Sequence, residues 1–237
     1  MKKVMKVVAA LMLTMTMVCT IGCVKKTSNI SYYGHDCVDL GLPSGTLWAT
    51  CNVGTDTPEG YGDYFAWGEI NPKDAYNWSN YKYSIGEGVW IHNSGIWDSL
   101  YLTKYCSLSS YGNNGYIDNQ TTLFPEDDAA EMNWSRGWRM PTKDEWQELL
   151  DNTTNTWTTQ NGVNGRLFTA ANGKSLFLPA AGSSMGDEGV RGLYWSLSLN
   201  AGFPHYAIDL CFSDESCIIM DECRCDGFSV RPVHSVK

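Results

Sequence analysis

The 237-residue sequence predicts one α+β domain with small antiparallel sheets, one or two short helices and long loops. Ten Trp and 13 Tyr occur beside 23 Gly, and such aromatic residues favour pleated surfaces whereas glycine favours turns. No internal repeat and no alternation of strands with helices is visible, which argues against solenoids and parallel sheets. A hydrophobic content of 43% supports a proper core and excludes a disordered chain.

The N-terminus has the composition of a secretory signal peptide. Three lysines within the first six residues precede an apolar stretch over residues 7–21, which is short for a membrane span. Cys23 resembles the lipidated cysteine of a bacterial lipobox, although Thr20 stands where that motif usually has Leu. We predict residues 1–22 as a lipoprotein signal peptide and Cys23 as the lipidation site. Ordinary cleavage, which would leave Cys23 as a free thiol, is the alternative.

The charge balance limits the partners. Asp and Glu number 26 against 17 Lys and Arg, and the net charge of −9 falls further when the three signal lysines are removed. An acidic surface repels nucleic-acid phosphates and anionic lipid heads, so we expect no nucleic-acid partner and membrane attachment through the N-terminal lipid. Residues 23–31 then form a polar tether to a domain over residues 32–237. The expected location is the bacterial cell envelope, with the outer membrane favoured and both of its faces open.

The first half of the domain predicts one strand, long loops and a short helix. Apolar residues alternate from Leu47 to Val53, as in a half-buried strand. Residues 76–122 are rich in Gly, Asn, Ser and Tyr, a composition typical of loops. A short helix is expected over residues 125–132, since Pro occupies its first turn and three acidic residues follow beside the positive end of the helix dipole.

The clearest helix begins at Thr142. The Thr142 hydroxyl can cap the helix while Glu145 reaches back to the cap residue, which is a capping box. Trp146, Leu149 and Leu150 then fall on one face, so this helix should cover the core.

The last third of the chain predicts antiparallel strands. Residues 166–170 and 174–178 flank an Asn-Gly pair, and both residue types tolerate the positive φ that a tight hairpin needs. Apolar residues alternate again over residues 206–212, and a last strand begins at Phe228.

Seven of the nine cysteines lie outside the signal peptide and its junction. They are Cys37, Cys51, Cys106, Cys211, Cys217, Cys223 and Cys225. Export would permit disulfides, but the number is odd, so at least one thiol stays free or pairs with another chain, and the pairing is open. The last four are spaced C-x5-C-x5-C-x-C and lack the CxxC pair typical of zinc sites, so we expect no metal and no cofactor.

The remaining motifs do not predict a catalytic residue. Residues 182–186 match G-x-S-x-G, but no helical period follows, so a Gly/Ser loop is the better interpretation than a nucleophile elbow. The four histidines lack the HExxH spacing of a metal helix, and the acidic clusters lack the spacing of a calcium loop.

Aromatic residues in the loop segment are the candidates for ligand binding. Flat rings with a polar edge beside Gly, Asn and Ser make adaptable contact surfaces for sugars or proteins. The candidates are Tyr76, Trp78, Tyr81, Tyr83, Trp90 and Trp97, with Tyr101 in the same segment. For most of these rings, however, the favoured interpretation is that they fold inward and attach the loops to the core, since aromatic residues are usually buried. Five other tryptophans are expected in the core, namely Trp48, Trp67, Trp138, Trp146 and Trp195.

Four segments together resemble one bacterial family. They are VDLGLPSGTLWATCNVG at residues 38–54, YGDYFAWGE at 61–69, GWRMPT with the following EW at 137–146, and SVRPV at 229–233. This combination resembles the Fibrobacter succinogenes major paralogous domain and extends over residues 38–233. The resemblance implies a C-type-lectin-like fold, distantly related to formylglycine-generating enzymes, in exported lipoproteins that usually have no assigned activity.

Two departures limit what the resemblance implies. The triplets Glu-Pro-Asn or Gln-Pro-Asp and Trp-Asn-Asp, with which C-type lectins bind calcium and sugar, are missing from this sequence. Formylglycine-generating enzymes bind copper with a cysteine pair near the C-terminus. Cys223 and Cys225 lie near that end of this chain, but their C-x-C spacing differs from that pair.

The resulting functional prediction is a lipid-anchored, non-catalytic envelope protein whose lectin-like domain binds a glycan or a surface protein. The ligand would meet the loops over residues 76–101 or the loop over 179–192. One alternative is an oxidase that uses Cys223 or Cys225, which requires a reactive thiol of low pKa. The other is a structural subunit of a surface assembly.

Overall fold

The computed structural model describes residues 30–86, 88–91 and 96–235. Cys23 and the predicted signal peptide lie outside the described residues. The first strand, β1 (Ile30–Tyr32), begins two residues before the predicted start of the domain. The described chain is mostly β-structure with two α-helices and several small sheets, and all strand pairs but one are antiparallel.

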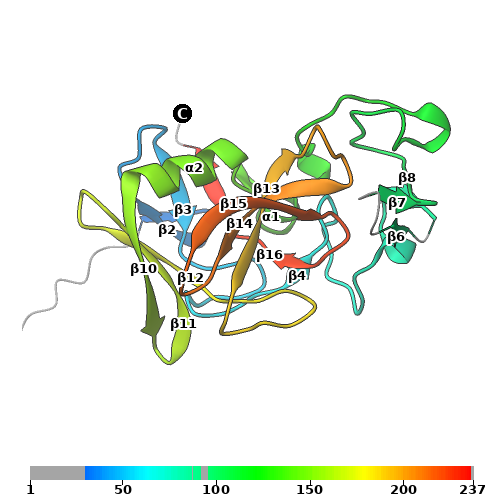
Figure 1. Ribbon diagram of the computed structural model, residues 1–237. Coiled ribbons are helices and arrows are strands. Elements are labelled where there is room, and N and C mark those ends of the chain that lie inside the picture. Colours follow the sequence, from blue (N-terminus) through cyan, green and yellow to red (C-terminus); the bar gives the residue numbers. More distant parts are fainter. Residues whose placement is uncertain (1–29, 87, 92–95, 236–237) are drawn as a thin grey trace, which may run out of the picture.

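One five-stranded sheet joins the two ends of the domain (Figure 1). Its order is β1, β2 (His35–Asp39), β3 (Thr46–Ala49), β17 (Val233–Ser235) and β9 (Trp138–Arg139). The expected strand over residues 47–53 is shorter than predicted, since β3 ends at Ala49. β2 and β17 pair with its two edges, and all four of its side chains are buried, so both of its faces are covered. A strand that is covered on both faces buries successive side chains, so β3 does not show the alternation of a half-buried strand.

A second five-stranded sheet forms the centre of the molecule. Its order is β15 (Cys217–Cys223), β14 (Tyr206–Phe212), β13 (Gly192–Leu199), β16 (Phe228–Ser229) and β4 (Tyr64–Phe65). The predicted strands at residues 206–212 and from Phe228 are confirmed. β15 lies at one edge of this sheet and pairs only with β14 among the described residues.

A three-stranded antiparallel sheet contains the predicted hairpin. β11 (Val163–Ala170) and β12 (Ser175–Pro179) pair across the Asn-Gly turn, where Gly173 has a φ of 78°. A further strand, β10 (Thr153–Gln160), pairs with β11 through a second Asn-Gly turn and was not predicted. Its polar, Thr-rich sequence carries no apolar alternation, so only the turn signalled it.

Helix α2 (Lys143–Asn152) confirms the predicted capping box. The Thr142 hydroxyl accepts a hydrogen bond from the Glu145 N–H at 3.1 Å, and the Glu145 carboxylate accepts one from the Thr142 N–H at 2.9 Å. Arg139 donates two further hydrogen bonds of 2.7 Å to the same carboxylate. The cap therefore also attaches the helix to strand β9.

Removal of this cap should destabilise the protein measurably. Thr142→Ala is expected to lower the free energy of unfolding by about 1 kcal/mol, because the N–H of Glu145 loses its acceptor at the helix start. Thr142→Ser keeps the hydroxyl and is the matched control, with a much smaller expected change. Urea unfolding of both variants measures this difference, and equal stabilities would contradict the role of the hydroxyl.

The predicted helix over residues 125–132 is present as two pieces. A 3-10 turn, η3 (Pro125–Asp127), precedes α1 (Ala129–Trp134), and Asp128 between them has extended backbone and caps α1 through the N–H groups of Ala130 and Glu131. Its buried carboxylate also accepts a hydrogen bond from the Met140 N–H at 2.9 Å. Asp127 thus ends the 3-10 turn η3, and Asp128 caps the start of α1.

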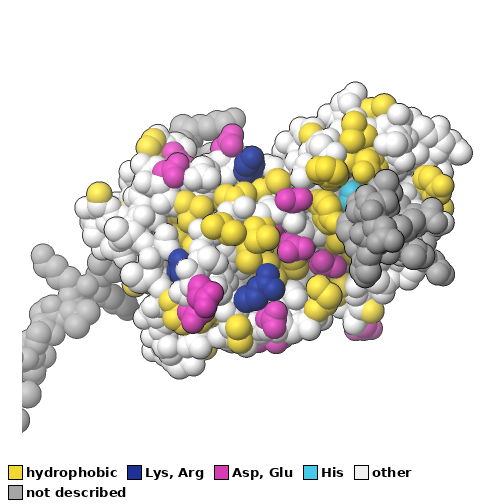
Figure 2. Space-filling model, in the orientation of Figure 1, with side chains coloured by type: hydrophobic (Ala, Val, Ile, Leu, Met, Phe, Trp, Pro, Cys, Tyr) yellow, Lys and Arg dark blue, Asp and Glu magenta, His cyan; other side chains and the backbone are white. Residues whose placement is uncertain are grey.

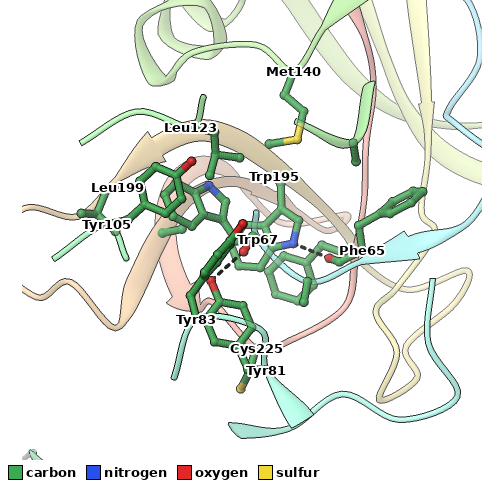
Figure 3. Close-up of a cluster of buried hydrophobic side chains, with 14 of the residues drawn as sticks. Phe65, Trp67, Tyr81, Tyr83, Tyr105, Leu123, Met140, Trp195, Leu199 and Cys225 are labelled. Carbon is green, nitrogen blue, oxygen red and sulfur yellow. Dashed lines mark hydrogen bonds between the residues drawn. The ribbon is translucent and has the colours of Figure 1, made fainter. Parts of the chain in front are cut away.

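The interior consists of aromatic clusters on both faces of the central sheet. The five tryptophans predicted for the core are confirmed, since each has zero exposed side-chain area. Figure 3 shows the larger cluster, in which the Trp195 indole donates a hydrogen bond to Phe65 O at 2.7 Å and the Tyr81 hydroxyl donates one to Trp67 O at 2.7 Å. The second cluster lies between the central sheet, α2 and the three-stranded sheet, and includes Trp48 and Trp146.

The loop segment forms a lobe at one side of the main body (Figure 1). Its short elements are η1 (Trp78–Asn80), β5 (Ser84–Ile85), β6 (Val89–Ile91), β7 (Ile96–Asp98), β8 (Tyr101–Leu102) and η2 (Asn113–Gly115). β5 pairs with β8, and β6 pairs with β7. The prediction of long loops is confirmed apart from these short pairs.

Candidate functional site

Three of the six candidate ligand-binding residues are buried, which removes them as ligand contacts and agrees with the interpretation that most rings of this segment fold inward. Trp78, Tyr81 and Tyr83 expose 4%, 3% and 7% of their surface and belong to the larger aromatic cluster. Tyr76 is half-buried, and its hydroxyl donates a hydrogen bond to Tyr64 O. These rings attach the start of the loop segment to the core, because a large ring gains more from burial than from exposure to water.

The two remaining candidates lie on a hairpin, and Tyr101 lies beside it in sequence. Trp90 on β6 and Trp97 on β7 are opposite each other in the strand register, and their side chains lie outside the described residues. Tyr101 on β8 exposes 45% of its surface. Tyr101 is therefore one of the aromatic residues of the segment that the structure places at the surface, as is Tyr116, which exposes 38%.

Tyr101 lines a polar pocket of about 400 Å³. The other lining residues are small or amide-bearing: Ser109, Ser110, Gly112, Asn113, Asn114 and Gly115. Ser and Asn supply both donors and acceptors of hydrogen bonds, while the Tyr101 ring supplies a flat apolar face. This combination suits a ligand with many hydroxyl groups and an apolar face, as sugars have.

The wall of the pocket depends on glycine and on a left-handed residue. A Cβ at Gly112 would lie 1.8 Å from Tyr116 O, so no other residue fits this close backbone approach. Asn114 has a φ of 51°, a conformation that Asn tolerates better than most residues. The N–H of Leu102 donates a 2.7 Å hydrogen bond to Tyr111 O and holds this wall against β8.

Asp118 fastens the end of the pocket loop. Its carboxylate accepts hydrogen bonds from the N–H groups of Tyr105, Cys106 and Gln120 at 2.7, 2.8 and 3.1 Å. Burial opposes ionisation of Asp118, but these backbone hydrogen bonds outweigh it and lower the pKa of the carboxyl below its ordinary value. The loop is thus held by an ionised group at neutral pH.

Asp127 anchors the base of the loop segment. It is 2% exposed, and its carboxylate accepts hydrogen bonds from the hydroxyls of Tyr83 and Tyr105 and from the ammonium groups of Lys82 and Lys104. Burial raises its pKa, but these four donors, Lys104 foremost, outweigh burial and lower the pKa to about 2.

Arg224 holds the same segment from the opposite side. It is fully buried, and its guanidinium donates hydrogen bonds to the Tyr81 hydroxyl at 2.9 Å and to the carbonyls of Tyr105 and Lys104 at 3.1 and 3.2 Å. The guanidinium also lies 4.8 Å from the Trp67 ring. Neither Asp127 nor Arg224 was among the residues predicted for the site, and no short motif marks them.

The second predicted ligand loop, over residues 179–192, is buried at its two ends, while Met185 and Val190 between them expose 75% and 58% of their surface. Ser183 N–H donates to Gly186 O at 2.8 Å, and Ser184 N–H donates to Gly227 O at 2.9 Å. No helix follows Gly186, so the G-x-S-x-G motif forms a tight loop, as predicted, and not a nucleophile elbow.

The cysteines and histidines form no reactive cluster in the part of the chain that the structure describes. All seven cysteines predicted for the domain are free thiols. Burial, followed by the charge of Asp226, raises the pKa of both Cys223 and Cys225, which counts against a thiolate nucleophile. Among the described residues, no group of three His, Cys, Asp or Glu side chains could hold a metal ion.

His205 and Asp209 are buried without hydrogen-bond partners for their side chains among the described residues, which the sequence did not predict. Neither ring nitrogen of His205 has a hydrogen-bond partner among the described residues, and burial, with the charge of Arg224, lowers its pKa to about 4. Asp209, in the middle of β14, is fully buried with both carboxylate oxygens unpartnered, and burial raises its pKa well above its ordinary value. The sequence signal for Asp209 was its position within a strand of alternating apolar residues.

No described helix combines the length and the apolar character needed to cross a membrane. Comparison with known proteins finds no matching family model, no matching curated protein and no matching solved structure.

Proposed function

We propose that this chain is a lipid-anchored, non-catalytic protein of the bacterial cell envelope, and that its lectin-like domain binds a glycan in the Tyr101 pocket. The observation that carries the proposal is the pocket itself, which the exposed Tyr101 lines together with Ser, Asn and Gly residues. The signal-like N-terminus and Cys23 support the envelope location, and the family resemblance supports the lectin-like fold.

The construction of the pocket also favours binding over catalysis. Its described lining has hydrogen-bonding groups but no carboxylate, histidine, lysine or cysteine. The Ser109 and Ser110 hydroxyls therefore have no base in the lining that could activate them as nucleophiles. The anchors at Asp127 and Arg224 hold the loop in place before a ligand arrives. A preformed loop loses less conformational entropy when a ligand binds, and this smaller cost favours ligand binding at a shallow polar site.

Glycan binding should depend on the Tyr101 ring. The purified full-length chain, in mild detergent and without added metal, is expected to bind one class of glycan on a polysaccharide array. Tyr101→Ala should weaken this binding about fivefold, because stacking of a sugar face on the ring contributes about 1 kcal/mol.

The matched control is Tyr33→Ala. Tyr33 is a tyrosine of similar exposure, 57%, in the turn between β1 and β2 and outside the pocket. It should leave glycan binding unchanged. A blank array, or an equal loss of binding in the two variants, would contradict the proposed function.

A further inference from the structure

The strand β15 presents an open edge. It is the outermost strand of the central sheet, it is seven residues long, and no strand pairs with its outer side in the described chain. Long exposed edges with apolar residues are usually covered or interrupted, because their free backbone groups pair readily with other chains. β15 contains neither Pro nor Lys, and its charged residues, Asp221 and Glu222, lie near one end of the strand.

The register shows which backbone groups point outward. At the two ends of the β14–β15 pair, Ser213 N–H donates to Ser216 O at 2.9 Å and Arg224 N–H donates to His205 O at 3.1 Å. Hydrogen-bonded residues alternate in an antiparallel pair, so the even-numbered residues of β15 bond to β14. The N–H and C=O groups of Ile219 and Asp221 therefore point away from the sheet, and no described residue hydrogen-bonds to them.

The side chains of this edge are apolar and partly uncovered. Ile218 and Met220 expose 49% and 37% of their surface. Ile219, together with Ile208 and Asp221, lines a groove of about 420 Å³ beside Lys143 at the start of α2. Figure 2 shows apolar side chains in a band across the region where Figure 1 places β14 and β15, with acidic side chains next to it.

Charge indicates what kind of strand this edge accepts. Asp214 and Glu215 precede β15, and Asp221 and Glu222 lie near its end. A second copy of the chain would bring these acidic groups together in either strand direction, since both ends of the edge are acidic. A cationic segment would instead meet opposite charges at both ends, and complementary charges favour encounter and register.

We propose that the outer edge of β15 binds an extended cationic peptide segment of another protein by strand addition. The added backbone would pair with Ile219 and Asp221, its alternate apolar side chains would cover Ile218 and Met220 or enter the groove, and its terminal Lys or Arg residues would meet the four carboxylates. This surface lies on different elements from the Tyr101 pocket, and the proposal does not depend on glycan binding.

The first test uses synthetic seven-residue peptides. A fluorescein-labelled Lys-Ile-Thr-Ile-Thr-Ile-Lys peptide is titrated with the full-length chain and followed by anisotropy. It should bind at least about tenfold more tightly than the same peptide with Glu at both ends, and the difference should shrink as salt is added. Methylating the peptide N–H groups along one edge should abolish binding, because strand addition needs these donors. Equal binding of the Lys-ended and Glu-ended peptides would overturn the proposal.

The second test changes the edge itself. Ile219→Pro removes an outward N–H without removing a bond to β14, and proline is tolerated at such edge positions. It should weaken peptide binding about tenfold, whereas Ile219→Thr, which keeps the N–H, should bind nearly as well as the original chain. The melting temperature checks that each variant is folded.

Two outcomes would refute the assignment. One is unchanged peptide binding by folded Ile219→Pro. The other is a dimer in sedimentation velocity that Ile219→Pro dissociates, which would make a second copy of the chain the occupant of this edge. If Ile219→Pro does not fold, the methylated peptide decides, because it leaves the protein unaltered.

Discussion

Arg224→Met is expected to lower the free energy of unfolding by about 3–5 kcal/mol, among the largest effects of any single substitution in this protein. The side chain is fully buried and donates four hydrogen bonds, to the Tyr81 hydroxyl and to the carbonyls of Lys104, Tyr105 and Pro204. Met fills similar space but donates nothing, so these buried acceptors would lose their partners. Unsatisfied buried polar groups account for most of the expected loss.

Chemical denaturation at neutral pH measures this effect. Arg136→Met is the matched control, because Arg136 is exposed and the same chemical change there should shift stability by less than about 0.5 kcal/mol. A change at Arg224 as small as that at Arg136 would show that the loop segment does not need the guanidinium. Because Arg224 joins the loop segment to the central sheet, its loss should also weaken the glycan binding that we propose for the Tyr101 pocket.

Asp127→Asn is the second substitution with a large expected effect, about 3 kcal/mol at neutral pH. Asn keeps the shape of the side chain but removes the negative charge that Lys82 and Lys104 meet, and one acceptor oxygen. The hydroxyls of Tyr83 and Tyr105 would then compete for one carbonyl oxygen.

The effect of Asp127→Asn should depend on pH in a defined direction. The pKa of Asp127 is lowered to about 2 in the folded chain, below its ordinary value of 3.8. Its carboxylate therefore contributes stability that is fully present above the ordinary pKa and is lost as the pH falls through the folded value. The stability difference between the original chain and Asp127→Asn should be largest at neutral pH and shrink between about pH 4 and about pH 2.

Unfolding curves across this pH range provide the measurement. Asp74→Asn is the control, since Asp74 is an exposed carboxylate in the same part of the chain. It should change stability little at any pH. A constant difference for Asp127→Asn from neutral pH to pH 2 would contradict the assigned ionisation of Asp127.

The elements predicted correctly from the sequence are those whose cause is local. Thr142 and Glu145 are three residues apart, so the capping box is visible in the sequence, and the Asn-Gly turn between β11 and β12 is equally short-range. Strand β10 shows the converse, because its Thr-rich sequence becomes a strand only by pairing with β11. Residues 125–132 contain two possible helix starts, Pro125 and Asp128. The hydrogen bond from the Met140 N–H to the Asp128 carboxylate is a tertiary contact that accompanies the break between them.

The candidate pocket touches the predicted ligand loops only at Tyr101, and its other lining residues follow them in the chain. Composition indicated the loop segment, yet Trp78, Tyr81 and Tyr83 are buried and Tyr101 is exposed. Tyr81, Tyr83 and Tyr101 have identical side chains, so only the path of the chain decides which of these rings reaches the core.

The sequence by itself determined the class of fold, the capped helix, the hairpin and the five core tryptophans, because each follows from residue size or from contacts within a few positions. Only the tertiary structure decided the pocket, its anchors and the open edge. Arg224 reaches Tyr81 across 143 positions, and Asp127 reaches Tyr83 across 44. Such contacts depend on how sheets and loops close on one another, and one residue cannot signal a partner so distant in the chain.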